Sequence, residues 1–266
     1  MLPLKYRADP SLDFLQFCSH GDLEPLVEIL TLAEGKPRWP QYLLGDDRFR
    51  PHAQDLPKAW ELVAAAIQRY GADDVASLIR LGEGVLYREV IGDVCVQMKV
   101  PLTGADTDVE HGADTDVEQI ERRLLAKVLE NAWEKMSDEE RVDFARNLKD
   151  RQGDATFDPV KIAPAALLAA LQGAILAGGF ASYQMAMVAA NFVSRAILNR
   201  GLALAGNAAL ARGLAVFAGP VGWALTVILA VPLLTGPALR ITIPATLYVA
   251  YLRQKNLNQD LLQPCL

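Results

Sequence analysis

Two pairs of residues in this chain are of types that could do chemistry together. Cys18 and His20 could form a thiol nucleophile with its base, and Glu89 and Asp93 could form a carboxylate pair one helical turn apart. Side chains two residues apart on a helix do not face each other, which favours a buried structural cysteine. The two carboxylates lie beside Arg88 and mildly repel at this spacing, which favours a solvated helix face.

A short acidic repeat offers a third possibility. The sequence GADTDVEH at 104–111 is followed directly by GADTDVEQ at 112–119. The repeated aspartates could bind calcium, but their spacing does not match the helix–loop–helix calcium loop, which also needs a Glu at its last position. We therefore expect a tandem duplication in an exposed acidic loop, where an insertion costs little free energy. The aspartates concerned are Asp106, Asp108, Asp114 and Asp116.

The sequence contains no motif typical of a known catalytic or cofactor site. It has no phosphate-binding loop, dinucleotide fingerprint, zinc-protease motif or nucleophile elbow. Its three cysteines are far apart and its three histidines have no matching ligands, so we expect neither a disulfide framework nor a zinc site. We predict no catalytic, cofactor-binding or metal-binding residue, and nothing positively supports an enzyme. The net charge of −6 gives no reason to expect nucleic-acid binding.

The first 158 residues are patterned as amphipathic helices around a common core, so we predict an all-α fold. Expected helices start at Asp9-Pro10 and at Gly21-Asp22 and then cover about 57–70, 73–81, 85–100, 117–136 and 138–149. Ser137 and Glu140 should form a capping box for the last of these. On the 117–136 helix the apolar stripe includes Ile120, Leu124 and Trp133. We expect four charged residues to lie on faces more open to solvent: Glu118, Glu121, Arg122 and Arg123.

The charge of the chain changes sign after Asp158. Residues 1–158 hold 31 of the 32 acids and 19 of the 26 bases, a net charge of −12. Residues 159–266 hold seven bases and one acid, a net charge of +6, and are rich in Ala and Gly. This asymmetry predicts an acidic, soluble helical domain over 1–158, including the 104–119 acidic loop repeat. An apolar, cationic helical region over 159–266 should follow it.

Two uncharged runs in the second half could associate with a membrane. Residues 162–194 and 213–239 lack charged side chains over 33 and 27 residues, and about 20 apolar residues suffice to cross a bilayer. Their Ala, Gly and Pro content also fits an apolar Ala/Gly-rich helical hairpin buried in a soluble protein, the less favoured of the two interpretations. The candidate membrane-associating residues are Arg195, Arg200 and Arg212, which suit either anionic headgroups or ordinary helix ends, with Gly219, Gly222 and Trp223 in the second run. A final helix is expected over about 243–254, with Arg253 near its end.

Several segments, in this order, resemble the bacterial YaaW family. They are DPSLDFLQFCS (9–19), WELVAAAIQRYGADDVASLIRLGEGVLYREVIGDVCVQMKV (60–100), VEQIERRLLAKVLENAWEKM (117–136), AGPVGWAL (218–225) and ITIPATLYVAYLR (241–253). That family is described as distantly related to the ubiquinol–cytochrome c chaperones. The resemblance supplies no catalytic residue to transfer, and it implies a helical domain that binds a client protein near a membrane.

Two functional hypotheses follow. The first is a non-enzymatic membrane-associated helical protein that inserts or oligomerises through residues 160–253. It would be cytoplasmic and peripheral or integral to the inner membrane, because the N-terminus has no signal-peptide pattern. The second is a soluble assembly chaperone or protein-interaction module. In this alternative the hairpin lies in the core, and Trp60, Tyr87 and Trp133 line a groove for a client. Self-association is compatible with both hypotheses.

Overall fold

The computed structural model describes residues 3–33, 36–37, 41–72, 84–102, 114–149, 159–179, 182–187 and 239–258. Within these ranges helices joined by loops and turns make up the structure, with two antiparallel strands of two residues, β1 (Leu32–Ala33) and β2 (Lys36–Pro37). The predicted all-α class is confirmed. The α-helices are α1 (Pro10–Asp13), α2 (His20–Thr31), α3 (Trp60–Gly71), α4 (Tyr87–Gln97), α6 (Asp114–Lys135), α7 (Asp138–Lys149), α8 (Pro164–Ala177) and α12 (Leu239–Leu257). Short 3-10 turns are η1 (Phe14–Phe17), η2 (Arg50–His52), η3 (Leu56–Ala59) and η5 (Pro159–Lys161).

Local sequence signals set the starts of several helices. The side chain of Asp9 accepts a hydrogen bond from the backbone N–H of Ser11 at the start of α1, and Pro10 follows it. Ser19 and Asp22 form a capping box at the start of α2. The predicted box before α7 is confirmed, because Ser137 N–H donates to Glu140 at 2.7 Å and Glu140 N–H donates to the Ser137 hydroxyl at 3.2 Å.

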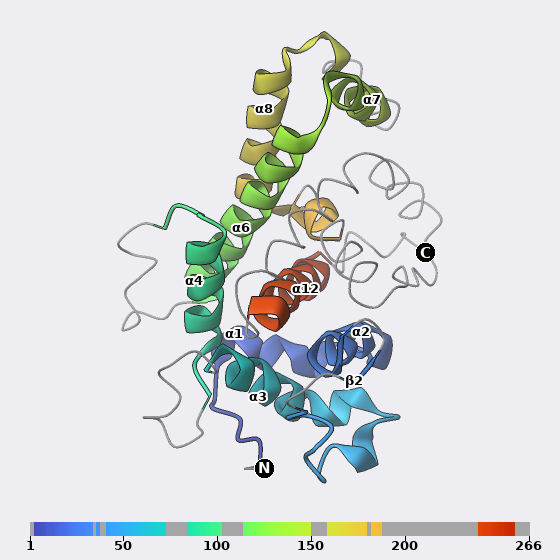
Figure 1. The fold of residues 1–266 in the computed structure, drawn as a ribbon, viewed down its shortest axis with the longest axis vertical. Coiled ribbons are helices and arrows are strands. Elements are labelled where there is room, and N and C mark those ends of the chain that lie inside the picture. The colour runs from blue at the N-terminus through green and yellow to red at the C-terminus, as the bar shows by residue number, and fades with distance from the viewer. Residues whose placement is uncertain are drawn as a thin grey trace.

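Helix α12 occupies the centre of the bundle (Figure 1). It packs against α2, α3, α4, α6 and the η1 turn, and every residue from Ile241 to Gln254 is buried. A helix that is apolar on all sides fits this position, because it must bury its whole circumference. The division of the chain at residue 158 is therefore a division of composition, and it does not separate α12 from the helices of the acidic half.

A pair of antiparallel helices extends away from this bundle. Helix α6 begins beside α4 and α12 and continues outward, with α8 packed along it (Figure 1). Helix α7 crosses the far end and contacts η5, which leads into α8. We call α6, α7 and α8 together the helical arm. The first turn of α6, from Asp114, is formed by the second copy of the acidic repeat, so this copy is not wholly a loop as expected.

Other sequence predictions fall outside the described ranges. They include the expected helix over 73–81, the first copy of the repeat and the uncharged run before α12. In the described ranges, no helix is both long enough and apolar enough to cross a membrane. Helix α8 ends at Ala177, where Gly178 has a φ of +87°, and a further helical stretch covers 182–187.

Asp46 anchors the N-terminal segment to the loop before η2. Its buried carboxylate accepts hydrogen bonds from the backbone N–H of Leu4 at 2.9 Å and from the backbone N–H of Arg48 at 3.1 Å. The Arg48 guanidinium adds two further bonds to the same carboxylate, at 2.9 and 2.7 Å. These bonds hold the pKa of Asp46 down to about 2, with the Arg48 side chain as the largest cause.

We predict that Asp46→Asn lowers the free energy of unfolding at pH 7 by about 1–2 kcal/mol, since the donors then face a neutral acceptor. The folded pKa of Asp46 lies below the unfolded value of about 4. The stabilisation is therefore present above pH 4 and is lost as the pH falls towards 2. Urea unfolding between pH 7 and pH 3 should show the parent and variant converging. Asp47→Asn, at an exposed pair with Arg50, should change little. A difference that stays constant down to pH 3 would contradict this assignment.

Candidate functional site: a buried polar network between α4, α6 and α12

A buried ion pair joins α6 to α12. Arg253 Nε donates to Glu121 Oε2 at 2.8 Å, and their side chains are 9% and 0% exposed. The two residues are 132 positions apart in the sequence. A buried ion pair must offset a large desolvation cost, so its geometry and remaining hydrogen bonds decide whether it is tolerated. In this protein further partners satisfy both charges.

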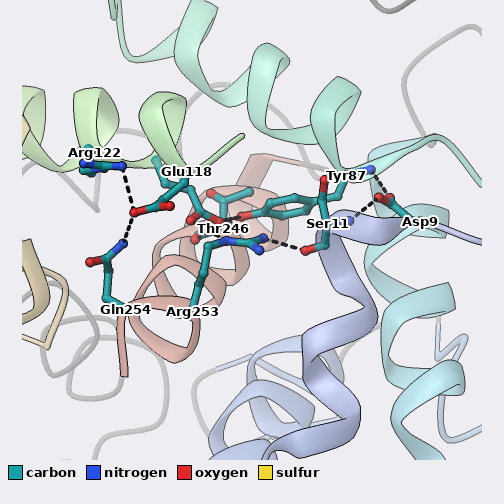
Figure 2. A network of polar contacts seen from close by, with 9 residues as sticks. Asp9, Ser11, Tyr87, Glu118, Arg122, Thr246, Arg253 and Gln254 are labelled. Atoms are coloured by element: carbon teal, nitrogen blue, oxygen red, sulfur yellow. Dashed lines mark hydrogen bonds and ion pairs between the residues drawn. The ribbon is translucent and has the colours of Figure 1, made fainter. Parts of the chain in front are cut away.

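Arg253 also reaches the N-terminal segment. Its terminal nitrogen donates to the backbone carbonyl of Ser11 at 2.5 Å, as drawn in Figure 2. Its guanidinium carbon lies 4.5 Å from the centre of the Phe14 ring, a cation–π geometry. One side chain of α12 therefore contacts α6, α1 and η1. The planar, multidentate guanidinium suits such a junction better than a lysine would.

Tyr87, at the start of α4, completes the network. Its hydroxyl donates to Glu121 Oε1 at 3.0 Å and lies 3.4 Å from the backbone carbonyl of Thr246 (Figure 2). Its backbone N–H donates to Asp9 Oδ2 at 2.6 Å. Asp9 therefore serves the first turn of α1 and the first turn of α4 together. This arrangement satisfies N-terminal donors that would otherwise be buried without acceptors.

Burial governs protonation in this network. It raises the pKa of Glu121, while the Arg253 guanidinium and the Tyr87 hydroxyl act in the opposite direction. Burial also raises the pKa of Tyr87 well above its usual value, so the phenol keeps its proton and remains a donor to Glu121. These buried groups hydrogen-bond to one another, and the bonds link α1, α4, α6 and α12. Their role in this structure is to hold these helices together.

Two charged residues expected on solvated helix faces are buried in the structure. Glu121 was expected on a face open to solvent, but it is fully buried. Arg88 was expected on a solvated face and is also buried. A signal for Glu121 exists: it lies four residues after Val117 and three before Leu124, both buried, so it shares their side of α6. Arg253 follows an apolar stretch of α12, and a buried arginine in such a place needs an acidic partner such as Glu121.

Cys18, His20 and Glu89, three of the four residues that could do chemistry, have structural environments or contacts instead. Cys18 is buried, as expected, and burial raises its pKa to about 12, so its thiol is protonated at neutral pH. His20 accepts a hydrogen bond at Nδ1 from the backbone N–H of Leu56 at 3.3 Å. Glu89 accepts one from the backbone N–H of Leu86, also at 3.3 Å. Among the described residues, no cluster of three or more His, Cys, Asp or Glu could hold a metal ion.

The three predicted protein-interaction residues lie on three different helices. Trp60, on α3, is half-buried and packs edge-to-face on Tyr6 at 5.3 Å between ring centres. Tyr87 is buried in the network on α4. Trp133, on α6, is buried in the arm against Phe144 at 5.7 Å. Their role in binding a partner stays a prediction.

The predicted membrane-associating residues lie outside the described ranges. They are Arg195, Arg200, Arg212, Gly219, Gly222 and Trp223. Their role also stays a prediction.

We predict that Glu121→Ala destabilises the protein by about 3–5 kcal/mol, because it leaves the Arg253 charge buried without its carboxylate. Glu134→Ala, at an exposed position of the same helix, should change stability by about 0.5 kcal/mol or less. Urea denaturation followed by circular dichroism measures both. A Glu121→Ala protein as stable as Glu134→Ala would show that the pair does not hold α6 and α12 together.

Comparison with known proteins places this chain among bacterial relatives. Residues 6–39, which include Asp9, Ser11 and Phe14 of the network, match a family described as "Domain of unknown function (DUF3944)". A UPF0174 protein of Helicobacter pylori strain J99 is 38% identical over 260 residues, covering 97% of this chain and 96% of that protein. The UPF0174 protein YaaW of Escherichia coli K12 is 31% identical over 258 residues, covering 94% and 96% of the two chains.

A second UPF0174 protein of Helicobacter pylori strain J99 is 34% identical over 208 residues, covering 78% of this chain and 93% of that protein. No solved structure matches the chain. The resemblance to the YaaW family drawn from the sequence is confirmed. The J99 protein with 38% identity and YaaW of Escherichia coli K12 each align with this chain over nearly their whole length and at more than 30% identity. The protein therefore belongs to the UPF0174 family, which includes YaaW.

Proposed function

We propose that the protein is a non-enzymatic, membrane-associated helical protein that docks on an anionic bilayer surface through α8 and the apolar region that follows. The observation that carries the proposal is the surface of α8. This helix of 14 residues has no charged side chain, yet most of its positions are exposed. Surface helices of ordinary soluble proteins place polar residues on their outer face.

The exposed side of α8 is made of small apolar residues and one large one. Leu167 and Ile175 are buried, whereas Leu176 is 47% exposed. We call the exposed set the α8 face: Pro164, Ala165, Ala166, Ala169, Ala170, Gly173, Ala174, Leu176 and Ala177. Alanine is only weakly hydrophobic, so this face supports shallow docking rather than deep insertion of α8 itself.

Charge favours a bilayer over other apolar partners. Residues 159–266 carry a net charge of +6, with no acid between Asp158 and Asp260. Basic residues near an apolar surface each gain about 1 kcal/mol at an anionic membrane. Lys161, exposed just before α8, is one such residue among those described. The N-terminal part of α8 extends along α6 away from the bundle (Figure 1).

A second candidate function is a soluble assembly chaperone or interaction module that offers the α8 face to a client protein. The observation in its favour is the burial of α12, which lies in the core although it belongs to the apolar half. The hairpin that this hypothesis places in the core is a different segment, and its described part, α8, is mostly exposed. The two candidates predict different ligands for one surface. Either would place the protein in the cytoplasm, the first at the inner face of the membrane.

We predict that the full-length protein floats with vesicles containing phosphatidylglycerol and much less with pure phosphatidylcholine vesicles, and that salt weakens the binding. The double variant Ala170→Glu/Leu176→Glu should bind about tenfold less, since losing about 1.4 kcal/mol changes an affinity by that factor. Phe17→Glu/Val96→Glu is the control with the same added charge, because Phe17 and Val96 are 69% and 71% exposed on η1 and α4 of the bundle, outside the α8 face.

Equal binding by the α8 double variant and the control would contradict docking through α8. A parent protein that ignores anionic vesicles at every pH tested would contradict membrane association altogether. If such a protein instead retained a specific client, and the α8 double variant lost that client, the second candidate function would replace the first.

A further inference from the structure

The C-terminal end of α8 is capped by a side chain from another helix. Arg122 Nη1, on α6, donates to the backbone carbonyl of Leu176 at 3.3 Å. The last carbonyls of a helix lack partners within the helix, and a cation there also complements the helix dipole. Helix α8 has no basic residue of its own. Arg122 therefore supplies a cap that the sequence of α8 cannot provide.

Gly178 makes room for this cap. Its φ of +87° lies in the left-handed region that favours glycine, and its backbone N–H donates to the Ile175 carbonyl at 3.1 Å. A Cβ atom at this position would lie 2.5 Å from Arg122 Nη1 and 3.2 Å from its guanidinium carbon. The guanidinium thus fills the space that any other residue at 178 would need. This close fit is independent of the hydrogen bond to Leu176.

The guanidinium is itself held in place from α6 and α12. Arg122 Nη2 lies 2.8 Å from Glu118 Oε1, one helical turn away on α6. The same oxygen accepts from Gln254 Nε2 of α12 at 3.4 Å, as Figure 2 shows. Gln254 is buried. A chain of polar contacts therefore runs from the core helix α12, through Glu118 and Arg122 of α6, to the end of α8.

We propose that Arg122 acts as a latch: its contacts with the Leu176 carbonyl and with Glu118 fasten the end of α8 to α6. Breaking these contacts frees α8 for docking on a bilayer. This second step rests on the proposed function. Helix α8 packs along α6 with Leu167 and Ile175 buried and with Leu168 and Leu171 half-buried against the core. Separating α8 from α6 adds these four side chains to the exposed α8 face. The latch therefore sets how much apolar surface the arm presents.

Hydrogen exchange of the α8 amides tests the latch in the full-length protein without any membrane. We expect Arg122→Gln and Gly178→Ala each to speed exchange in 168–177 about tenfold, with α3 amides unchanged. Gly178→Ala displaces the guanidinium without altering Arg122, so the double variant should exchange less than about twofold faster than Gly178→Ala alone. Arg146→Gln, an exposed arginine of the arm, is the control. Unchanged α8 exchange in Arg122→Gln would overturn the latch whatever Gly178→Ala shows, because an alanine at a φ of +87° strains the end of α8 by itself.

Vesicle flotation of the same variants tests what the latch controls. We expect Arg122→Gln to bind phosphatidylglycerol vesicles more tightly than the parent protein, although it has lost a positive charge. Faster α8 exchange together with weaker vesicle binding would overturn the role in docking. A third outcome is faster α8 exchange in the variants with no vesicle binding by either the parent or the variants. This outcome would support the latch and refute the proposed membrane docking.

Discussion

Glu121 and Arg253 can be buried only together, and this requirement fixes how the helices are arranged. A carboxylate or guanidinium left unpaired in the core would cost several kcal/mol, a large part of the stability of a typical domain. Helices α6 and α12 must therefore approach in the one register that brings these two side chains within 2.8 Å. Apolar side chains tolerate small shifts along a helix, whereas this pair with its additional partners does not.

That register has consequences along the whole of α12. It brings the Thr246 carbonyl to the Tyr87 hydroxyl and the guanidinium of Arg253 to the Ser11 carbonyl. Near the end of the helix, Lys255 forms an ion pair with Asp22 of α2. A segment from the apolar, cationic half thus completes a core that begins in the acidic half. The charge composition divides the chain at residue 158, whereas the packing joins α12 to the helices of the acidic half.

The sequence predicts the local structure well because local structure depends on neighbouring residues. The Asp9 cap, the Ser137–Glu140 box and the bounds of α7 are examples. The network was missed, because it joins residues such as Tyr87, Glu121 and Arg253 that are far apart in the chain. Amphipathic patterning assigns charged residues to solvent by default, and this rule fails for Glu121. The role of Arg122 depends on Gly178, 56 positions later, which periodicity within one helix cannot reveal.

Native-state hydrogen exchange shows whether α12 is part of the acidic bundle or of a separate region. In a single bundle, the amides of Leu247, Val249 and Tyr251 exchange only through global unfolding. Their exchange free energies should then match those of Val63 to Ile67 in α3 as denaturant is added. Exchange of the α12 amides through a separate, lower-energy opening, while α3 remains protected, would contradict the single bundle.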